Sequence, residues 1–540
     1  MKKYFLILII LLAFVLRFYK LATYPALNAD EAAIGYNAYS LLLTGGDEHG
    51  NLWPIHFQSF NDYKPGLYFY VVLPFVKVIG LNEWAVRIPG AALGVLTVLI
   101  IYLLTKELFK DEKISIFSSL LLGISPWHIH FSRGGWEVNL ATFLIALGVW
   151  LFLKYVNGFR QKYLYLSIFA FALSLYAYHA ARVVVPLLGV VLAAIYFKDL
   201  FRKVKPIVVG GILLVALLLP LLKDLVGPAG ISRAAGVGLF ADPGPLNRIN
   251  EQRGEHAVFT SLIPKLFHNK VVNYGLAFLE NWVSHYHGEF LFLSGDAIQR
   301  NKVPETGQLY LFEIITVVLG VIFLLRRFDK SSKVVFVWLL IAPLASALTF
   351  QSPHALRAHN MVIPITIISA VGLMVLFNWF GSLKRYKNLL FILFSFVMAL
   401  NFAMYLHMYW VHMAKEYPYS SQYGVKELVD FVKKNESTYK NIVVTDRYDQ
   451  PYILFLFYAK YDPIMFQKDH ALTPRDQFGF STVREFDKYR FITFGKWEEV
   501  RGSYPNSLII STPAQIPQEA NIIKRIYGSN GFEYFDIVAN

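Results

Sequence analysis

The chain has 540 residues, of which 56% are hydrophobic and only 16% are charged. Soluble domains carry about 25% charged residues, so this composition excludes a single water-soluble core and indicates a protein embedded in lipid. The formal net charge of +14 does not require nucleic acid, because basic residues retained on the cytoplasmic side of a membrane explain it. The absence of cysteine excludes disulfide bonds and thiolate metal sites.

Eleven apolar segments are predicted to span the membrane as helices, because each approaches the length of about 20 apolar residues that a span needs. The first follows Met1 and ends without a signal-peptide cleavage site, which favours an uncleaved span. The predicted spans are 4–20, 88–105, 114–131, 139–156, 163–179, 183–198, 205–222, 308–325, 333–350, 360–379 and 388–408.

Segment 65–82 is apolar but contains Pro65, Pro74 and Lys77, so it is either a twelfth span or a helix lying in the membrane interface. With this segment in the interface and the N-terminus in the cytoplasm, the cytoplasmic segments hold 18 Lys and Arg residues. The short outer loops then hold only three, and a twelfth span would reverse this bias. The three are Arg133, Arg182 and Arg357.

The predicted fold class is an α-helical polytopic membrane protein with a small C-terminal α/β domain. Residues 1–410 form the transmembrane domain, with large outside loops at 21–87 and 223–307. The second loop has the composition of a lid, with Pro243-Gly244-Pro245 and several charges. Residues 411–540 form an extracytoplasmic domain of a multi-pass plasma-membrane protein.

The C-terminal domain shows both helical and strand patterns. Residues 425–434 carry apolar side chains at helical spacing. Three short apolar runs are typical of buried strands. These runs are 441–445, 490–494 and 507–511.

Asp30 and Glu31 stand together in the first outside loop, just past the first span. Paired carboxylates serve as a general base, as ligands of a divalent cation, or as both. The alternative is a helix N-terminus, with Asn28 or Asp30 as the cap and Glu31 at the positive end of the helix dipole. The two interpretations are compatible, because a helix start holds a carboxylate rigidly.

Cationic side chains accumulate on the same predicted face. Lys64, with Asp62 close before it, precedes the interfacial segment, and Arg87 opens the second span. Each alone is explained as a snorkelling or interfacial cation, whereas a cluster beside carboxylates suits a lipid-linked sugar phosphate. Further ionisable residues at this face are Arg133, Glu137, His179, Arg182, His354 and Arg357.

The order of these motifs resembles the type C glycosyltransferases of family 39, which include protein O-mannosyltransferases and the lipid A aminoarabinose transferase. The resemblance covers residues 1–200 best, with a weaker echo at 356–364. The matching motifs are Asp30-Glu31, Lys64-Pro65, Arg87-Ile-Pro-Gly90 and the acidic residue that follows Ser125-Pro126.

The resemblance implies a polyprenyl-phosphate donor carrying a mannose-like sugar, and a hydroxyl acceptor on a protein, lipid or glycan at the outer face. Asp30 would deprotonate the acceptor with support from Glu31, and the transfer would invert the anomeric centre. Lys64 and Arg357 would bind the donor phosphate, with Arg87 as a candidate support. Glu137 corresponds to a second acidic residue of the aminoarabinose transferases.

Supporting roles are also expected for Asp62, Arg133, His179, Arg182 and His354. No cofactor is certain, and a divalent cation stays open because Tyr63 replaces the glutamate that precedes the Lys-Pro motif in the aminoarabinose transferases.

Two other classes compete with the transferase. A transporter or lipid flippase would have many spans, but transporters usually show internal repeats and ionisable residues at the membrane midplane. This sequence shows no internal repeat, and its ionisable residues gather at one face. A membrane-anchored scaffold would not need Asp30, Lys64 or Arg357.

Overall fold

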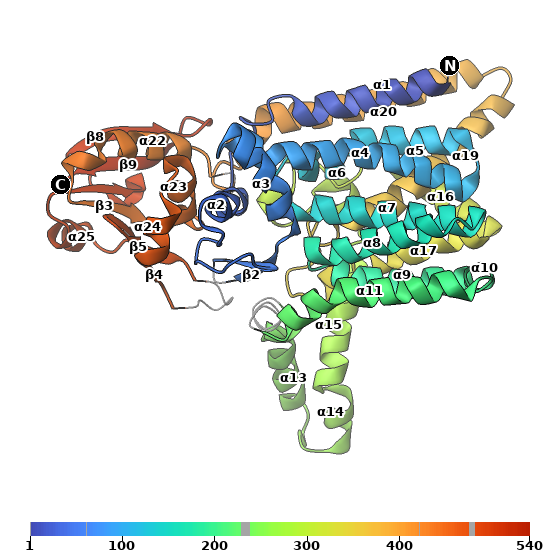
Figure 1. Ribbon diagram of the computed structural model, residues 1–540, viewed down its shortest axis with the longest axis horizontal. Coiled ribbons are helices and arrows are strands. Elements are labelled where there is room, and N and C mark those ends of the chain that lie inside the picture. The colour runs from blue at the N-terminus through green and yellow to red at the C-terminus, as the bar shows by residue number, and fades with distance from the viewer. Residues whose placement is uncertain (1, 61, 228–237, 421, 475–480) are drawn as a thin grey trace. The chain divides into compact units, whose positions relative to one another are not determined.

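The computed structural model describes residues 2–60, 62–227, 238–420, 422–474 and 481–540 (Figure 1). Residues 228–237 of the predicted second loop lie outside this described part. The chain divides into two compact units. The helical unit comprises Met1–Arg17, Ala92–Ser132 and Glu137–Leu406, and the mixed unit comprises Phe18–Ala91, Arg133–Trp136 and His407–Asn540.

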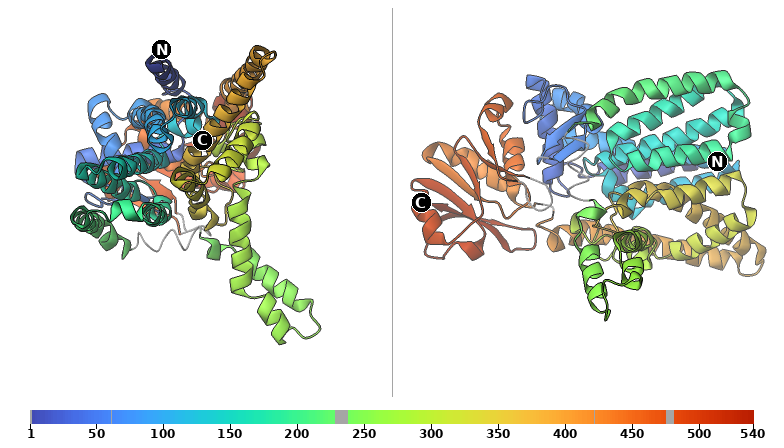
Figure 2. Two further views of the ribbon diagram at one scale, coloured as in Figure 1. Left: turned by 90° about the vertical axis from the view of Figure 1, so that its right-hand side faces the viewer. Right: turned by 90° about the horizontal axis from the view of Figure 1, so that it is seen from below.

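The helical unit is a bundle of long apolar helices that run side by side, as the end-on view in Figure 2 shows. Its long helices are α1 (Lys2–Phe18), α4 (Glu83–Phe109, from residue 92), α5 (Glu112–Ile124), α7 (Glu137–Gly158), α8 (Gln161–Ala177), α9 (Ala181–Ile195), α11 (Val204–Leu225), α16 (Glu313–Arg327), α17 (Lys330–Ile341), α19 (Val362–Ser382) and α20 (Lys387–His407). Short helices continue or join them: α6 (Pro126–Ser132), α10 (Phe197–Leu200) and α18 (Leu344–Ala347).

A helix occupies each of the eleven predicted spans, which confirms a multi-pass helical protein. Among the described residues, six helices are long and apolar enough to cross a membrane, and the pair α5–α6, bent by 57°, makes a seventh. The remaining four, α1, α8, α9 and α16, have 15 to 17 residues each. The count of eleven spans and the orientation in the membrane therefore stay predictions.

Small residues allow close helix packing in the bundle. A Cβ atom at Gly320 of α16 would overlap the backbone of Ile368, and one at Gly372 of α19 would overlap the backbone of Thr316. The hydroxyl groups of Thr316 and Ser369 are 2.7 Å apart across this contact. Close backbone approach with a hydrogen bond across it is typical of helices that associate within a membrane.

The second long loop is largely helical. It forms α13 (Gly244–Gly254), α14 (Leu262–Phe267) and α15 (Lys270–Ser284). The end of α15 packs on the bundle, where Trp282 Nε1 donates to the Leu340 carbonyl at 3.0 Å and Asn281 Nδ2 donates to that of Thr349 at 2.9 Å. The rest of this helical hairpin extends away from the bundle (Figures 1 and 2). Its predicted role as a lid is not tested by this geometry.

The mixed unit contains a seven-stranded sheet of order β4-β5-β6-β3-β7-β9-β8. The central strand β3 is parallel to β6 and β7, and the other pairs are antiparallel. The strands are β3 (Asn441–Thr445), β4 (His470–Leu472), β5 (Val483–Phe486), β6 (Tyr489–Ile492), β7 (Ser507–Ser511), β8 (Ile522–Tyr527) and β9 (Glu533–Ala539). Its helices are α21 (Met413–Glu416), α22 (Val425–Asn435), α23 (Pro451–Ala459), α24 (Pro463–Lys468) and α25 (Trp497–Ser503).

The predicted α/β domain is therefore confirmed. Strands β3 and β7 occupy the predicted segments, and β6 begins and ends one or two residues before the predicted 490–494. The apolar runs of β3 and β7 are buried, as expected for parallel strands covered on both faces. Helix α25 covers one face, where Val500 packs with Val443 and Ile509.

The first outside loop packs with residues 407–540 in one compact unit. It forms α2 (Ala29–Thr44), the hairpin strands β1 (His56–Ser59) and β2 (Asp62–Pro65), and α3 (Leu67–Ile79). Helix α2 lies against α23, where Gly35 leaves room for the ring of Phe457. This association was not expected from the sequence, and the functional division into 1–410 and 411–540 stays a prediction.

Candidate active site

The N-terminus of α2 presents the two predicted carboxylates. Asn28 caps the helix: its side chain accepts from the backbone N–H of Glu31, and the Glu31 side chain accepts from the Asn28 backbone N–H. This reciprocal pair satisfies amide groups that a helix start would leave open. Asp30 and Glu31 both lie in the first turn, where the helix dipole favours negative charge.

Asp30 is paired with Lys64. The Lys64 Nζ donates to Asp30 Oδ1 at 2.6 Å, and the ammonium also lies 4.4 Å from the centre of the Phe60 ring. Strand β2 delivers Lys64 to this position through its antiparallel pairing with β1. The Asp30 side chain is 22% exposed, so a carboxylate held by a cation is also accessible to solvent. The predicted base and the predicted phosphate ligand thus meet in space.

Glu31 is held in the interior instead. Arg87 binds both of its carboxylate oxygens at 2.6 Å, and the backbone N–H of Gly135 donates to Oε1 at 2.9 Å. The side chains of Glu31 and Arg87 are 1% and 0% exposed. The remaining donors of Arg87 bind the carbonyl groups of Leu21, Pro25 and Ala26. Glu31 therefore fixes the start of α2 to α4, and the guanidinium is surrounded by protein acceptors rather than open to a phosphate.

Two supporting candidates have structural partners in the same unit. Arg133 donates to the Tyr409 hydroxyl at 2.9 Å and to the Tyr19 carbonyl at 2.8 Å, and it lies 4.8 Å from the Trp410 ring centre. Asp62 is buried at the start of β2 and accepts from the backbone N–H of Tyr63. These contacts hold the two side chains in place, and they do not test the functional roles predicted for them.

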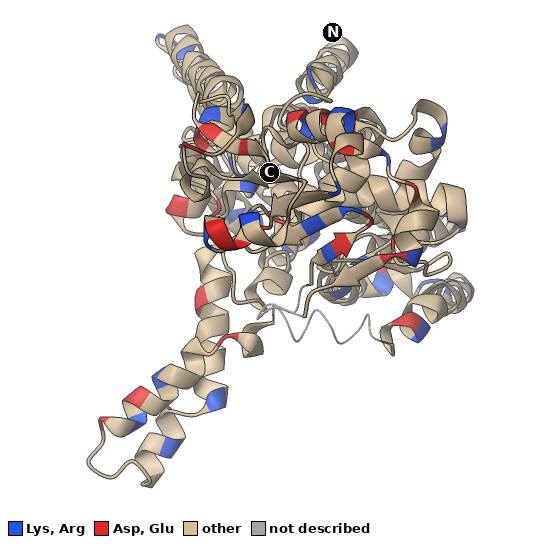
Figure 3. Ribbon diagram, turned by 90° about the vertical axis from the view of Figure 1, so that its left-hand side faces the viewer, with Lys and Arg blue, Asp and Glu red and all other residues tan. Residues whose placement is uncertain are grey.

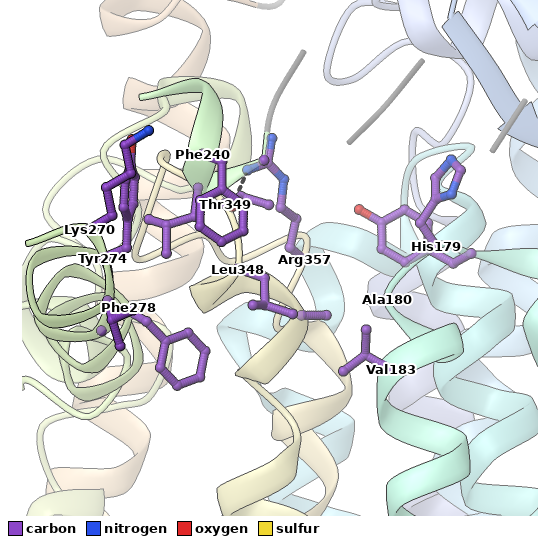
Figure 4. Close-up of a pocket in the computed structure, with 16 residues that line it drawn as sticks. His179, Ala180, Val183, Phe240, Lys270, Tyr274, Phe278, Leu348, Thr349 and Arg357 are labelled. Carbon is purple, nitrogen blue, oxygen red and sulfur yellow. Dashed lines mark hydrogen bonds between the residues drawn. The ribbon is translucent and has the colours of Figure 1, made fainter. Parts of the chain in front are cut away.

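The helical unit contains a largely apolar cavity of about 760 Å³ that is edged by cations. Figure 4 shows Arg357 between residues of α15 on one side and His179 on the other. Arg357 donates to the Thr349 hydroxyl at 2.6 Å and to Gln351 Oε1 at 3.2 Å. The apolar lining includes Val183, Leu239, Phe240, Val271, Phe278, Ala345 and Leu348.

Lys270 and Tyr274 also line this cavity, and sequence reasoning missed them. They lie four residues apart on α15, so they share one helix face. The signal was the helical spacing within residues 270–284, which lie inside the predicted outside loop 223–307.

The other predicted cations of the helical unit pair locally. Arg182 Nη1 lies 3.0 Å from His179 Nδ1. His354 Nδ1 lies 3.6 Å from Asp296, a buried carboxylate that the sequence analysis missed. Burial raises the pKa of Asp296, against backbone hydrogen bonds from Ile298 and Ala355 that lower it. Glu137 is nearly buried in the first turn of α7 and belongs to the helical unit, whereas Asp30 belongs to the mixed unit.

Residues of the C-terminal domain form hydrogen bonds with helix α2 and with the segment that follows it. The Gln422 side chain accepts from the backbone N–H of Ala29, one residue before Asp30. Glu48, which follows α2 and is fully buried, accepts from Asn37 and from the Tyr452 hydroxyl, each at 2.9 Å. Sequence reasoning missed the contacts of Gln422 with Ala29 and of Tyr452 with Glu48, because each joins residues about 400 positions apart.

Within the described part of the chain, no group of three or more His, Asp or Glu side chains is arranged to hold a metal ion. The nearest strong partner of Asp30 is an ammonium group rather than a second carboxylate. A divalent cation at Asp30 therefore finds no ready set of ligands among these residues.

Residues 63–223 match the family described as dolichyl-phosphate-mannose-protein mannosyltransferase, PMT_2. An uncharacterised protein of Aquifex aeolicus (strain VF5) is 28% identical over 186 residues, which are 34% of this chain and 36% of that protein. The match thus spans only about a third of this relative.

Solved structures share the fold at low identity. ArnT from Cupriavidus metallidurans in the apo state has a TM-score of 0.55 at 10% identity, over 99% of this chain and 98% of that one. The Archaeoglobus fulgidus oligosaccharyltransferase in the apo form has a TM-score of 0.51 at 14% identity, over 85% of this chain and 64% of that one. Residues 63–223 thus resemble the PMT_2 family, and the fold is shared with ArnT.

Proposed function

We propose that this protein transfers a sugar from a polyprenyl-phosphate donor to a hydroxyl acceptor. The observation that carries the proposal is the Asp30–Lys64 pair, a partly exposed carboxylate 2.6 Å from an ammonium at a capped helix N-terminus. A positioned carboxylate is a general base, and a neighbouring cation stabilises negative charge that develops on a leaving phosphate.

In the proposed reaction, Asp30 takes the proton of the acceptor hydroxyl. The acceptor oxygen forms a bond to the anomeric carbon, and the bond from that carbon to the phosphate oxygen breaks with its electron pair staying on the phosphate. Attack opposite the leaving group inverts the anomeric centre. Lys64 faces the developing phosphate charge, while Glu31 and Arg87 act as positioning residues for α2.

The cavity of the helical unit is the proposed site of the donor lipid. An apolar lining suits a polyprenyl chain, and Arg357, His179 and Lys270 at its edge suit a phosphate. One ArnT structure is described as bound to undecaprenyl phosphate, and one structure of the archaeal oligosaccharyltransferase as a complex with a dolichol-phosphate. These likenesses support a lipid phosphate as ligand, and the mannose-like sugar and the acceptor class follow only from the family description.

The proposed topology has eleven spans, a cytoplasmic N-terminus, and the mixed unit and loop 223–307 on the outer face of the plasma membrane. The distribution of Lys and Arg supports it. Helix α3 supports an interfacial rather than a spanning segment, because its 13 residues include Pro74 in the interior and Lys77 in the last turn.

The test uses purified protein in liposomes with radiolabelled undecaprenyl-phosphate mannose and a panel of other sugars. The release of sugar from the lipid is measured, and donor binding is measured in parallel. We expect the wild type to consume donor and Arg357→Gln to bind it more weakly. If neither transfer nor hydrolysis occurs with any sugar while labelled lipid crosses the bilayer, the protein is a flippase and the proposal is wrong.

A further inference from the structure

The helical hairpin formed by α13, α14 and α15 ends in an exposed apolar tip. Phe259 and Ile263 are 61% and 62% exposed, which is close to the 63% of Phe396 on the bundle helix α20. Soluble surfaces rarely gather such side chains without a partner. The exposed apolar residues of the tip are Val258, Phe259, Leu262, Ile263, Leu266 and Phe267.

Internal hydrogen bonds set the shape of the hairpin. Arg253 Nε at the end of α13 donates to the carbonyl of His268 at 2.7 Å, which ties the two sides together beneath the tip. Asn269 caps α15 by accepting from Val272 N–H, and its amide donates to the Leu266 carbonyl at 2.7 Å. These bonds leave the apolar tip facing outward instead of folding it back on the bundle.

The direction of the hairpin points to its partner. Figures 1 and 2 show α13 and α15 running across the axes of the bundle helices and leaving the bundle near one end. Spanning helices follow the membrane normal to within a modest tilt. A hairpin that runs across them, near their ends, therefore lies along the membrane surface rather than pointing into water.

The charges of the hairpin fit the same partner. Residues 256–264 contain no Lys, Arg, Asp or Glu and lie between Glu255 and Lys265. The loop at the end of the hairpin is accordingly tan in Figure 3. Helix α13 is polar, with Asn247, Arg248 and Glu251 exposed. An apolar edge with lysines on its C-terminal side, next to a polar helix that faces water, is the pattern of elements that lie in a lipid interface.

We propose that the hairpin of residues 244–284 is an interfacial anchor whose tip inserts into one leaflet of the bilayer. Helix α15 then connects this leaflet with the cavity. Its residues Lys270, Tyr274 and Phe278 line the cavity, whereas Leu276 and Leu279 on another face are exposed. A lipid chain can reach the cavity along α15 without leaving the apolar phase. The insertion itself does not depend on the proposed transferase activity.

The absence of cysteine makes the wild-type chain a clean background for site-specific labelling. Ile263→Cys is labelled with an environment-sensitive fluorophore in the full-length protein, reconstituted at one copy per nanodisc. Glu251→Cys on the polar α13 and Lys496→Cys in the mixed unit are the matched exposed controls. Lipids brominated near the headgroup end of the chain quench from the membrane, and aqueous iodide quenches from water.

For insertion about 5–10 Å into the headgroup region, we expect brominated lipid to quench the label at 263 at least about threefold more than either control. Iodide should show the opposite order. Strong iodide quenching at 263 without lipid quenching would overturn the proposal and leave the hairpin in water. Protection from both quenchers that appears only at two copies per nanodisc would identify a second copy of the chain as the partner instead.

Discussion

Asp30 and Glu31 are neighbours in the sequence and carry the same functional group, yet their surroundings differ completely. Asp30 is 22% exposed and pairs with the Lys64 ammonium group, whereas Glu31 is 1% exposed and its two oxygens accept from Arg87, Asn28 and Gly135. Successive residues of a helix point about 100° apart, so one carboxylate faces the surface and the other the interior.

The two environments suit different roles for Asp30 and Glu31. A buried carboxylate with all its hydrogen bonds made can hold structure, but it has no lone pair left for an acceptor hydroxyl. A carboxylate that is accessible to solvent can exchange a proton with a substrate. We therefore propose that Asp30 carries out the chemistry and that Glu31 positions the helix, and variants of these residues and their partners test this difference.

Asp30→Asn is expected to have the largest effect on activity. Losing a general base lowers kcat by about 10²- to 10⁴-fold, while donor binding and the thermal unfolding midpoint in detergent stay close to wild type. Single-turnover release of labelled sugar measures the rate. Unchanged turnover in this variant would remove Asp30 from the reaction.

Glu31→Gln is expected to act mainly on stability. Removing the charge leaves Arg87 buried without its counter-ion, and breaking a buried pair costs about 3–5 kcal/mol. Thermal unfolding of the purified protein measures the loss. The double variant Glu31→Gln with Arg87→Met removes both charges and should recover part of it. A wild-type unfolding midpoint in Glu31→Gln alone would contradict the structural role.

Lys64→Gln is expected to lower kcat with a smaller effect than Asp30→Asn. A charge-assisted hydrogen bond contributes about 1.5–3 kcal/mol, which corresponds to roughly 10- to 100-fold in rate. Lys64→Arg keeps the charge and serves as the control, with an intermediate rate expected. Equal rates for wild type and Lys64→Gln would show that the ammonium group contributes only to the resting structure.

The smallest effect is expected at an ion pair of the same unit that lies near the surface. Lys426 Nζ is 2.6 Å from Glu83, but the Lys426 side chain is 58% exposed. Exposed pairs contribute about 0–1 kcal/mol, so Lys426→Gln should leave both unfolding and turnover nearly unchanged. A loss as large as that of Glu31→Gln would mean that distance alone, rather than burial, sets the strength of these pairs.

Several features of this protein follow from its sequence alone, because they depend on local patterns. Apolar length marks the helices of the bundle, and helical and strand periodicity mark α22, β3 and β7. The sequence also predicted a helix cap at Asn28 or Asp30, and the structure has it at Asn28. The family resemblance over the first 200 residues is likewise carried by short motifs, and the match at residues 63–223 confirms it.

Only the tertiary structure decided which of two adjacent carboxylates faces solvent and which meets Arg87, because the partners lie 34 and 56 residues away. It also brought the first outside loop together with residues 407–540 and formed the cavity from α15 and Arg357. Periodicity within a segment specifies which face of a helix is apolar. It does not specify what packs on that face, since distant contacts depend on how all the elements fill space together.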